Sequence, residues 1–200
     1  MHTRRLASLL IGAWLAGSAF MIWVATGNFR SVEEVLRARS TKAQREINDI
    51  GPARARALLR YHASEQNRHY FYYWEIVQIA LGVVLAVVLL FATNGNKLIM
   101  ALVAFMLAII LIMHFRISPQ ITELGRAIDF AGSEQMSVER DVFWNYHKAY
   151  SAMEVLKIGL GLLLGVRMLY STHQLKRRSG KSTGKNINRV NDSNNTHINR

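Results

Sequence analysis

Four long runs of apolar residues alternate with polar segments along the chain. The runs cover about residues 6–26, 74–93, 97–116 and 151–171. Each provides about 20 residues, which at about 1.5 Å per residue of helix cross the roughly 30 Å of hydrocarbon in a bilayer. The aromatic cluster 70–74 before the second run is typical of a membrane interface. The pattern predicts an all-α fold, an integral membrane up-and-down four-helix bundle with helices extended past one face of the bilayer.

The first run follows two arginines, as the apolar part of a cleavable signal peptide would. Its 21 uncharged residues include Trp14 and Trp23, and they exceed the roughly 7–15 apolar residues of most signal peptides. We therefore interpret residues 6–26 as a span that stays in the protein.

The polar segments carry helix signals of their own. Ser31, with Glu34 three residues later, is a capping-box signature for the start of a helix. Ser118-Pro119 marks either the start of another helix or a kink in one long third helix. The expected extramembrane helices cover about residues 31–48, 53–73, 119–130 and 138–150.

The positive charge of the chain is concentrated behind the fourth run. The net charge is +12, and residues 172–200 hold seven Lys or Arg and one Asp, so this tail carries half of the excess. Basic residues directly after a membrane helix favour anionic lipid, and the lack of apolar periodicity predicts disorder. We expect a four-span membrane domain over 1–172 and a basic, Asn-rich, disordered tail over 173–200. The expected partner is membrane lipid, including anionic lipid at the tail, and not nucleic acid.

Four spans place both ends of the chain on one side of the membrane. Arg4, Arg5, Lys97 and the basic tail lie on that side, and the positive-inside rule then makes it the cytoplasm. Five arginines near the span ends of the first long connection argue for the reverse orientation. We predict cytoplasmic termini in a multi-pass protein of a bacterial inner membrane or a eukaryotic endomembrane.

Composition and motifs argue against several kinds of chemistry. The chain has no cysteine, which excludes disulfides, iron–sulfur clusters and thiol nucleophiles. It also lacks the G-x-S-x-G, H-E-x-x-H, Walker and dinucleotide-binding patterns. We therefore expect a noncatalytic protein without a cofactor or a metal.

Ionisable residues gather where three of the runs meet the long connections. Glu75 opens the second span, His114 and Arg116 close the third, and Glu154 and Lys157 open the fourth. Charged groups near hydrocarbon are costly unless they are paired. We expect the two charges of the fourth span, one helical turn apart, to pair with each other and to face Glu75 and Arg116.

Together with a histidine just outside the fourth span, these residues form the predicted ligand-binding site. Its members are Glu75, His114, Arg116, His147, Glu154 and Lys157. The predicted function is to bind a small molecule, an ion or a lipid, or to help transport it, through a polar pocket near one leaflet. The structural alternative is that these side chains reach out to headgroups and lock the bundle, as in a noncatalytic interaction subunit of a membrane complex.

A haem-binding redox subunit is a third functional alternative. A haem held by two histidines needs them at one depth on facing helices. His114 lies about 8–10 Å deeper than His69 or His147 at the rise of a helix, so the histidines match this requirement poorly.

Pairs of small residues indicate close helix packing. Ala13 with Gly17, and Gly161 with Gly165, have the spacing that lets two helix backbones approach each other. The partner helix belongs either to the same chain or to a second copy in a homo-oligomer.

Four short motifs point to a family. They are Gly12-Ala-Trp14, Gly27-Asn-Phe29-Arg30, Ser118-Pro119 and Phe143-Trp-Asn-Tyr146-His147. Over about residues 6–172 the chain resembles the four-helix membrane family that includes transmembrane protein 205 and many bacterial proteins with a domain of unknown function. The resemblance implies a multi-pass membrane fold, with Pro119 and His147 at family-type positions. The chain differs from the family pattern at Tyr150 and Glu154, where the pattern favours a small hydroxyl residue and an Asn.

Overall fold

The structure is a computed structural model that describes residues 2–37, 40–93, 96–130 and 137–198, with residues 2, 137 and 169–198 described in their backbone only. Over these residues the chain forms helices and no strand. In chain order the elements are α1 (His2–Leu36), α2 (Thr41–Ile50), α3 (Pro52–Ala92), α4 (Lys97–Ile112), the π-helical turn η1 (Met113–Ile117), α5 (Ser118–Ile128) and α6 (Ser137–Ile198).

Four stretches are long and apolar enough to cross a membrane. They are Thr3–Leu36, Pro52–Ala92, Lys97–Ile128 and Val138–Met168. The all-α prediction is therefore confirmed, and the four helices are compatible with a multi-pass integral membrane protein.

The end of α6 differs from what the sequence predicts. Disorder is expected over 173–200, whereas the backbone of α6 continues as a helix to Ile198. This part of the chain contains no proline that would end a helix. Its side chains lie outside the described residues, as do the contacts with anionic lipid that the basic tail leads us to expect.

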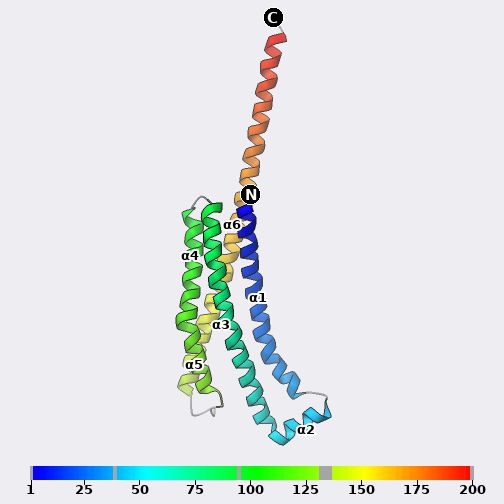
Figure 1. Ribbon diagram of the computed structural model, residues 1–200, viewed down its shortest axis with the longest axis vertical. Coiled ribbons are helices and arrows are strands. Elements are labelled where there is room, and N and C mark those ends of the chain that lie inside the picture. The colour runs from blue at the N-terminus through cyan, green and yellow to red at the C-terminus, as the bar shows by residue number, and fades with distance from the viewer. Residues whose placement is uncertain (1, 38–39, 94–95, 131–136, 199–200) are drawn as a thin grey trace.

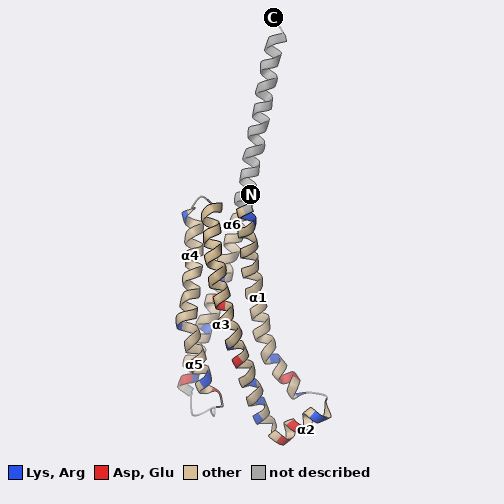
Figure 2. Cartoon of the chain, in the orientation of Figure 1, with Lys and Arg blue, Asp and Glu red and all other residues tan. Residues whose placement is uncertain are grey.

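The four long helices lie side by side (Figure 1). α1 packs against α3 and α6, and α4 packs against the same two helices. The N-terminus, the end of α3 and the start of α4 lie at one end of the bundle, beyond which the backbone of α6 continues, whereas α2 and the end of α5 lie at the other end of the bundle (Figure 1). Acidic and basic residues are concentrated toward this second end (Figure 2).

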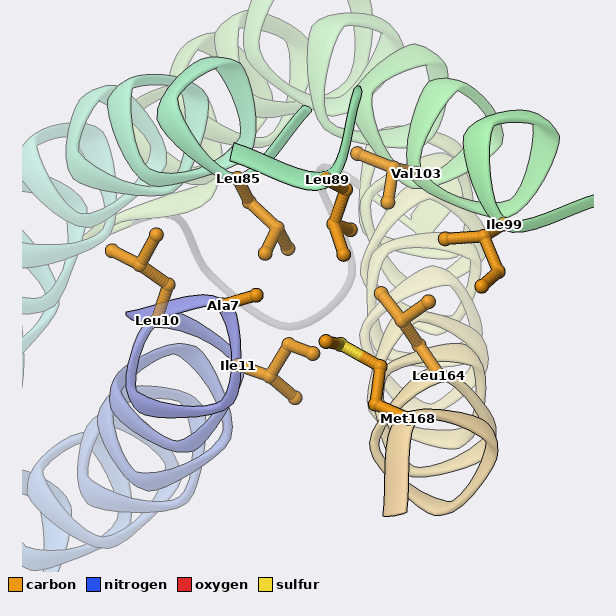
Figure 3. Close-up of a cluster of buried hydrophobic side chains, with 9 residues drawn as sticks. All are labelled: Ala7, Leu10, Ile11, Leu85, Leu89, Ile99, Val103, Leu164 and Met168. Carbon is orange, nitrogen blue, oxygen red and sulfur yellow. The ribbon is translucent and has the colours of Figure 1, made fainter. Parts of the chain in front are cut away.

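Apolar side chains from all four helices meet in the interior. Figure 3 shows the largest cluster, made of Ala7, Leu10, Ile11, Leu85, Leu89, Ile99, Val103, Leu164 and Met168. Each of these residues is buried. Many large apolar side chains on the outer faces are exposed instead, among them Phe20, Trp23, Phe91 and Phe105. An apolar exterior of this kind suits contact with hydrocarbon and would be a liability in water.

The first helix is longer than predicted. α1 continues through Ser31 to Leu36, and the Ser31 hydroxyl donates to the carbonyl of Asn28 instead of capping a new helix. The predicted helix start at residue 31 is therefore wrong. α2 begins ten residues later, where the Ser40 hydroxyl accepts from the Ala43 N–H. The continuation of α1 is held against α3, because the Asn28 amide donates to the Asn67 side chain at 2.6 Å.

The third long helix continues through a π-helical turn and does not restart at Ser118-Pro119. The Ser118 N–H donates to the carbonyl of Met113, five residues back, which makes η1 a π-helical turn. Proline has no N–H to donate, and its ring presses on the carbonyl four residues earlier. The wider turn places one extra residue before Pro119 and lets the helix pass from α4 into α5. Of the two alternatives that the sequence leaves open, the structure shows the single long helix, with a π-helical turn before Pro119.

Candidate functional site

A cluster of polar side chains interrupts the apolar interior at one level of the bundle. We call Glu75, Gln78, Glu154 and Lys157 the buried polar layer; Glu75, Gln78 and Lys157 are 0% exposed and Glu154 is 8% exposed. Two of these residues come from α3 and two from α6. Uncompensated charges are expensive in such surroundings, so the partners of each group decide what the layer can do.

Lys157 is the centre of the first half of the layer. Its ammonium group donates to Glu154 Oε1 at 2.8 Å and to Gln78 Oε1 at 2.6 Å. The Gln78 amide in turn donates to the same Glu154 oxygen at 3.5 Å. The ion pair therefore joins positions one helical turn apart on α6, and the glutamine connects it to α3.

Glu75 is the centre of the second half. Its Oε2 lies 2.9 Å from Nδ1 of His114, and its Oε1 accepts a hydrogen bond from the Ser118 hydroxyl. His114 belongs to η1, and Ser118 is the first residue of α5. The π-helical turn and the first residue after it thus supply both partners of a carboxylate that has no exposure of its own. The His114 side chain is 14% exposed, so this half of the layer reaches the edge of the bundle.

Several buried polar atoms next to these groups have no partner. Among the described residues, Trp14 Nε1, Ser18 Oγ, Trp74 Nε1, Tyr150 Oη and Glu154 Oε2 are buried and make no hydrogen bond. Buried polar groups in proteins are nearly always satisfied by protein, water or ligand. The interior of the bundle therefore has unused hydrogen-bonding capacity on α1, α3 and α6.

The structure brings together four of the six predicted site residues. Glu75 meets His114, and Glu154 meets Lys157. Arg116 is exposed, because it lies two residues after His114 and so points to the opposite side of the helix. His147 is also exposed, and its ring stacks on Phe143 with the ring centroids 5.9 Å apart. The expected pairing of Arg116 with the interior charges is therefore absent, and neither residue joins the layer.

Three contributing residues were not among the predicted site residues. Gln78 lies three positions after Glu75, and Ser118 lies four positions after His114, so each shares a helix face with a predicted residue. Tyr150 lies four positions before Glu154 and is buried. Such residues can be identified as polar residues that lie three or four positions from a charged residue within or beside an apolar run.

A second group of charges lies outside the layer, where α3 meets α5. The Arg126 guanidinium donates to both oxygens of Glu65 at 2.9 Å, and Arg68 pairs with Glu65 and, at 3.0 Å, with Asp129. Glu65 precedes the apolar part of α3 by more than two turns. The hydrogen bond from Arg126, with a smaller effect of Arg68, lowers the pKa of Glu65 to about 2, against the opposing effect of its partial burial.

The comparisons with protein-family models, curated proteins and solved structures find no match for this chain. Among the described residues, no group of three or more His, Asp or Glu side chains is arranged to hold a metal ion. The geometry of the buried polar layer is thus the basis for assigning a function.

Proposed function

We propose that this chain is a multi-pass membrane protein that binds a small molecule, an ion or a lipid headgroup at the buried polar layer and helps it enter or cross the membrane. The observation that carries the proposal is the complete burial of Lys157 and Glu75 within helices of membrane-spanning length. Replacing a buried ion pair by apolar residues is often neutral or stabilising. Stability alone therefore does not account for these buried charges, which points to a function. In membrane helices, ionisable residues mark pathways for ions and substrates.

The proposal includes the up-and-down arrangement of the four spans. Its support is that α1 and α4 each pack against both α3 and α6, as expected when consecutive antiparallel spans form a ring. α3 has 41 residues, which corresponds to about 60 Å, twice the thickness of the hydrocarbon. We therefore infer that it extends past the bilayer at the end where α2 lies. Cytoplasmic termini remain part of the proposal, on the charge distribution given above.

The depth of the layer fits a site near one leaflet. Gln78 lies 14 residues before Ala92, the last residue of α3, which is about 20 Å along the helix. If the bilayer boundary lies near the end of α3, the layer is inside the hydrocarbon but closer to the opposite surface. A solute there would be within reach of that surface and separated from the other by the apolar cluster around Leu89.

A ligand panel tests the proposal on the full chain in lipid nanodiscs. The panel contains sodium, potassium, small primary amines, inorganic phosphate and phospholipids, and the measurement is the unfolding temperature. We expect at least one member to stabilise the protein by a few degrees, and the neutral double variant Glu154→Gln/Lys157→Met to lose this response. Lys97→Met, an exposed lysine at the start of α4, is the matched control and should keep it. A double variant that responds to the panel as the natural chain does would contradict the proposal.

One observation favours a second candidate function, that of an interaction subunit. None of the described residues of α2 is buried, and its apolar residues Ala43, Ile47 and Ile50 recur at the spacing of one helix face. A partner protein would cover this face. In that case the double variant would match the natural chain throughout the panel, and Ile47→Lys would instead disrupt the complex on a native gel.

A further inference from the structure

The edge of the bundle at His114 lies at the level expected for one surface of the membrane. At the other end of the bundle, the Arg4 guanidinium donates to the carbonyl of Ala92 at 3.3 Å, which places a charged group at the end of α3. Tyr72 lies 20 residues before Ala92 on the same helix, and this length corresponds to about 30 Å, the thickness of the hydrocarbon. With one boundary at Ala92, the other boundary therefore lies near Tyr72, whose ring is next to that of His114.

Exposed aromatic rings lie on both sides of His114 at this level. The centroids of the Tyr72 and Phe115 rings are 5.4 Å and 4.8 Å from the centroid of the His114 ring. Tyr72 is 52% exposed and Phe115 is 67% exposed. Exposed aromatic side chains are typical of the headgroup level of a membrane, and the face of an aromatic ring attracts a cation. The two rings therefore favour a positively charged group beside the imidazole.

The hydrogen bond to Glu75 determines what His114 offers to such a group. Nδ1 of His114 lies 2.9 Å from Glu75 Oε2, and an ionised carboxylate only accepts, so Nδ1 carries the proton. In a neutral imidazole the second nitrogen, Nε2, is then an acceptor. Glu75 has no exposure, whereas the His114 side chain is 14% exposed. The imidazole is therefore the member of this pair that a group outside the bundle can reach, and the group that fits Nε2 is a donor.

The formal charge of the interior behind this edge is negative. Glu75, Glu154 and Lys157 are the charged residues that are buried in the part of the chain the structure describes. Their sum is one negative charge, and a net charge in hydrocarbon is costly. Lys157 is bonded to Glu154, whereas the partners of Glu75 are His114 and the Ser118 hydroxyl. A cation bound to the imidazole would compensate the charge of Glu75.

We propose that the edge formed by Tyr72, His114 and Phe115 binds a primary ammonium group, either of a phospholipid headgroup or of a free amine. One N–H of the ammonium donates to His114 Nε2, and its positive charge lies against the two aromatic rings. The quaternary ammonium of choline has no N–H and keeps only the ring contacts. The site therefore distinguishes ethanolamine from choline headgroups, which share the same phosphate and the same net charge. This inference goes beyond the proposed function, because it does not involve the pair of Glu154 and Lys157.

Fluorescent phosphatidylethanolamine and phosphatidylcholine, labelled on the acyl chain, test the inference on the full chain in detergent micelles. The measurement is the apparent Kd of each lipid from fluorescence anisotropy at about pH 8, where imidazoles are ordinarily neutral. We expect the ethanolamine lipid to bind about tenfold more tightly, which corresponds to about 1.4 kcal/mol, close to one hydrogen bond to a charged group. His114→Phe keeps an aromatic ring but has no acceptor, and it should bind the two lipids equally.

A second variant keeps the inference testable if His114→Phe fails to fold. Tyr72→Leu removes one exposed ring and should weaken binding of the ethanolamine lipid about threefold. Tyr73→Leu is the matched control, because Tyr73 is 53% exposed and its ring contacts Tyr72 and His69 but not His114. It should bind as the natural chain does. Equal binding of the two lipids by the natural chain overturns a headgroup site, and Tyr72→Leu binding as tightly as Tyr73→Leu overturns the role of the rings.

Free ethanolamine distinguishes the two sources of the ammonium group. Displacement of the ethanolamine lipid by free ethanolamine, in the natural chain but not in His114→Phe, would show that an amine in solution also occupies the site. If neither the lipid nor free ethanolamine binds in a manner that depends on His114, the inference is overturned altogether. The double variant Glu154→Gln/Lys157→Met separates this inference from the proposed function. A preference for ethanolamine that persists in it, without any panel response that requires the ion pair, would contradict the proposed function and support the edge site.

Discussion

The side chain of Lys157 depends on two partners that lie inside the bundle. Its ammonium group bonds to Glu154 and Gln78 with no exposure to the surroundings. Whether such a group stabilises the protein is decided by what remains when it is removed. Replacing both members of a buried ion pair by uncharged residues is often neutral or stabilising, whereas removing one member alone is strongly destabilising.

We predict that Lys157→Met destabilises the protein by about 3–5 kcal/mol, because it leaves the Glu154 carboxylate buried without its cation. The double variant Glu154→Gln/Lys157→Met should recover most of this loss, since it leaves no unpaired charge. Lys97→Met should change the stability by less than about 0.5 kcal/mol. The measurement is the free energy of unfolding in detergent. A single variant as stable as the double one would show that the two side chains do not form a buried pair.

The charged residues of the layer and the pairing of Glu154 with Lys157 could be predicted from the sequence, but the contacts of Gln78 and Ser118 could not. Glu75, Glu154 and Lys157 can be identified from the sequence, because charged residues are rare within apolar runs of membrane-spanning length. Arg116 has the same signal, yet it points outward. Which side of a helix faces the interior depends on the rotation of the helix in the bundle, and the π-helical turn at His114 changes that rotation locally.

The long helices approach each other closely where small residues leave room. A Cβ atom added to Gly17 of α1 would lie 2.1 Å from the indole ring of Trp74 on α3. One added to Gly161 of α6 would lie 3.1 Å from Leu15 on α1. Both small-residue pairs identified in the sequence therefore contribute to packing within the chain, and their spacing does not require a second copy.

At the scale of the helices we predict that Gly17→Ala destabilises the protein by about 1–3 kcal/mol, because the new methyl group overlaps the partly buried indole ring of Trp74. Gly12→Ala is the matched control: it lies on the same helix with no atom within 4 Å of the added Cβ. There the change should be neutral or stabilising by up to about 1 kcal/mol, since alanine favours a helix more than glycine does. Thermal unfolding of the two variants side by side measures the difference. Equal effects would contradict the close contact of α1 and α3.

At some helix boundaries, contacts with another helix override the local sequence pattern. Ser31 and Glu34 have the spacing of a capping box, but α1 passes through them because Asn28 and Val32 pack against α3. The continuous helix of α3 could be anticipated, since no breaker separates Ala53 from Asn94. The continuation of the helix past Pro119 could be anticipated only as one of two alternatives, because a proline permits both a helix start and a position inside a distorted helix.

At the scale of the whole molecule, exposed apolar residues and charged residues occupy different parts of the structure. Four helices present apolar faces to the outside, and the charged residues gather at the end with α2 and α5 (Figure 2). The number of spans and the all-α class follow from the lengths of the apolar runs, which is why the sequence predicts them. The family resemblance stays an expectation, and so does the orientation, because positive charges lie on both sides of the spans.

The central claim is that polar side chains of α3 and α6 meet inside the bundle, where Gln78 contacts the ion pair of Glu154 and Lys157. Because the chain has no cysteine, a crosslink between two introduced cysteines reports on the proximity of those two positions alone. We predict that a bifunctional thiol reagent with a short spacer links Gln78→Cys to Lys157→Cys in membranes, since the ends of the two natural side chains, both longer than cysteine, lie 2.6 Å apart. The control pair places the first cysteine at Val77, whose side chain is 45% exposed, and should not crosslink. Crosslinking of the Val77 pair without the Gln78 pair would contradict the account.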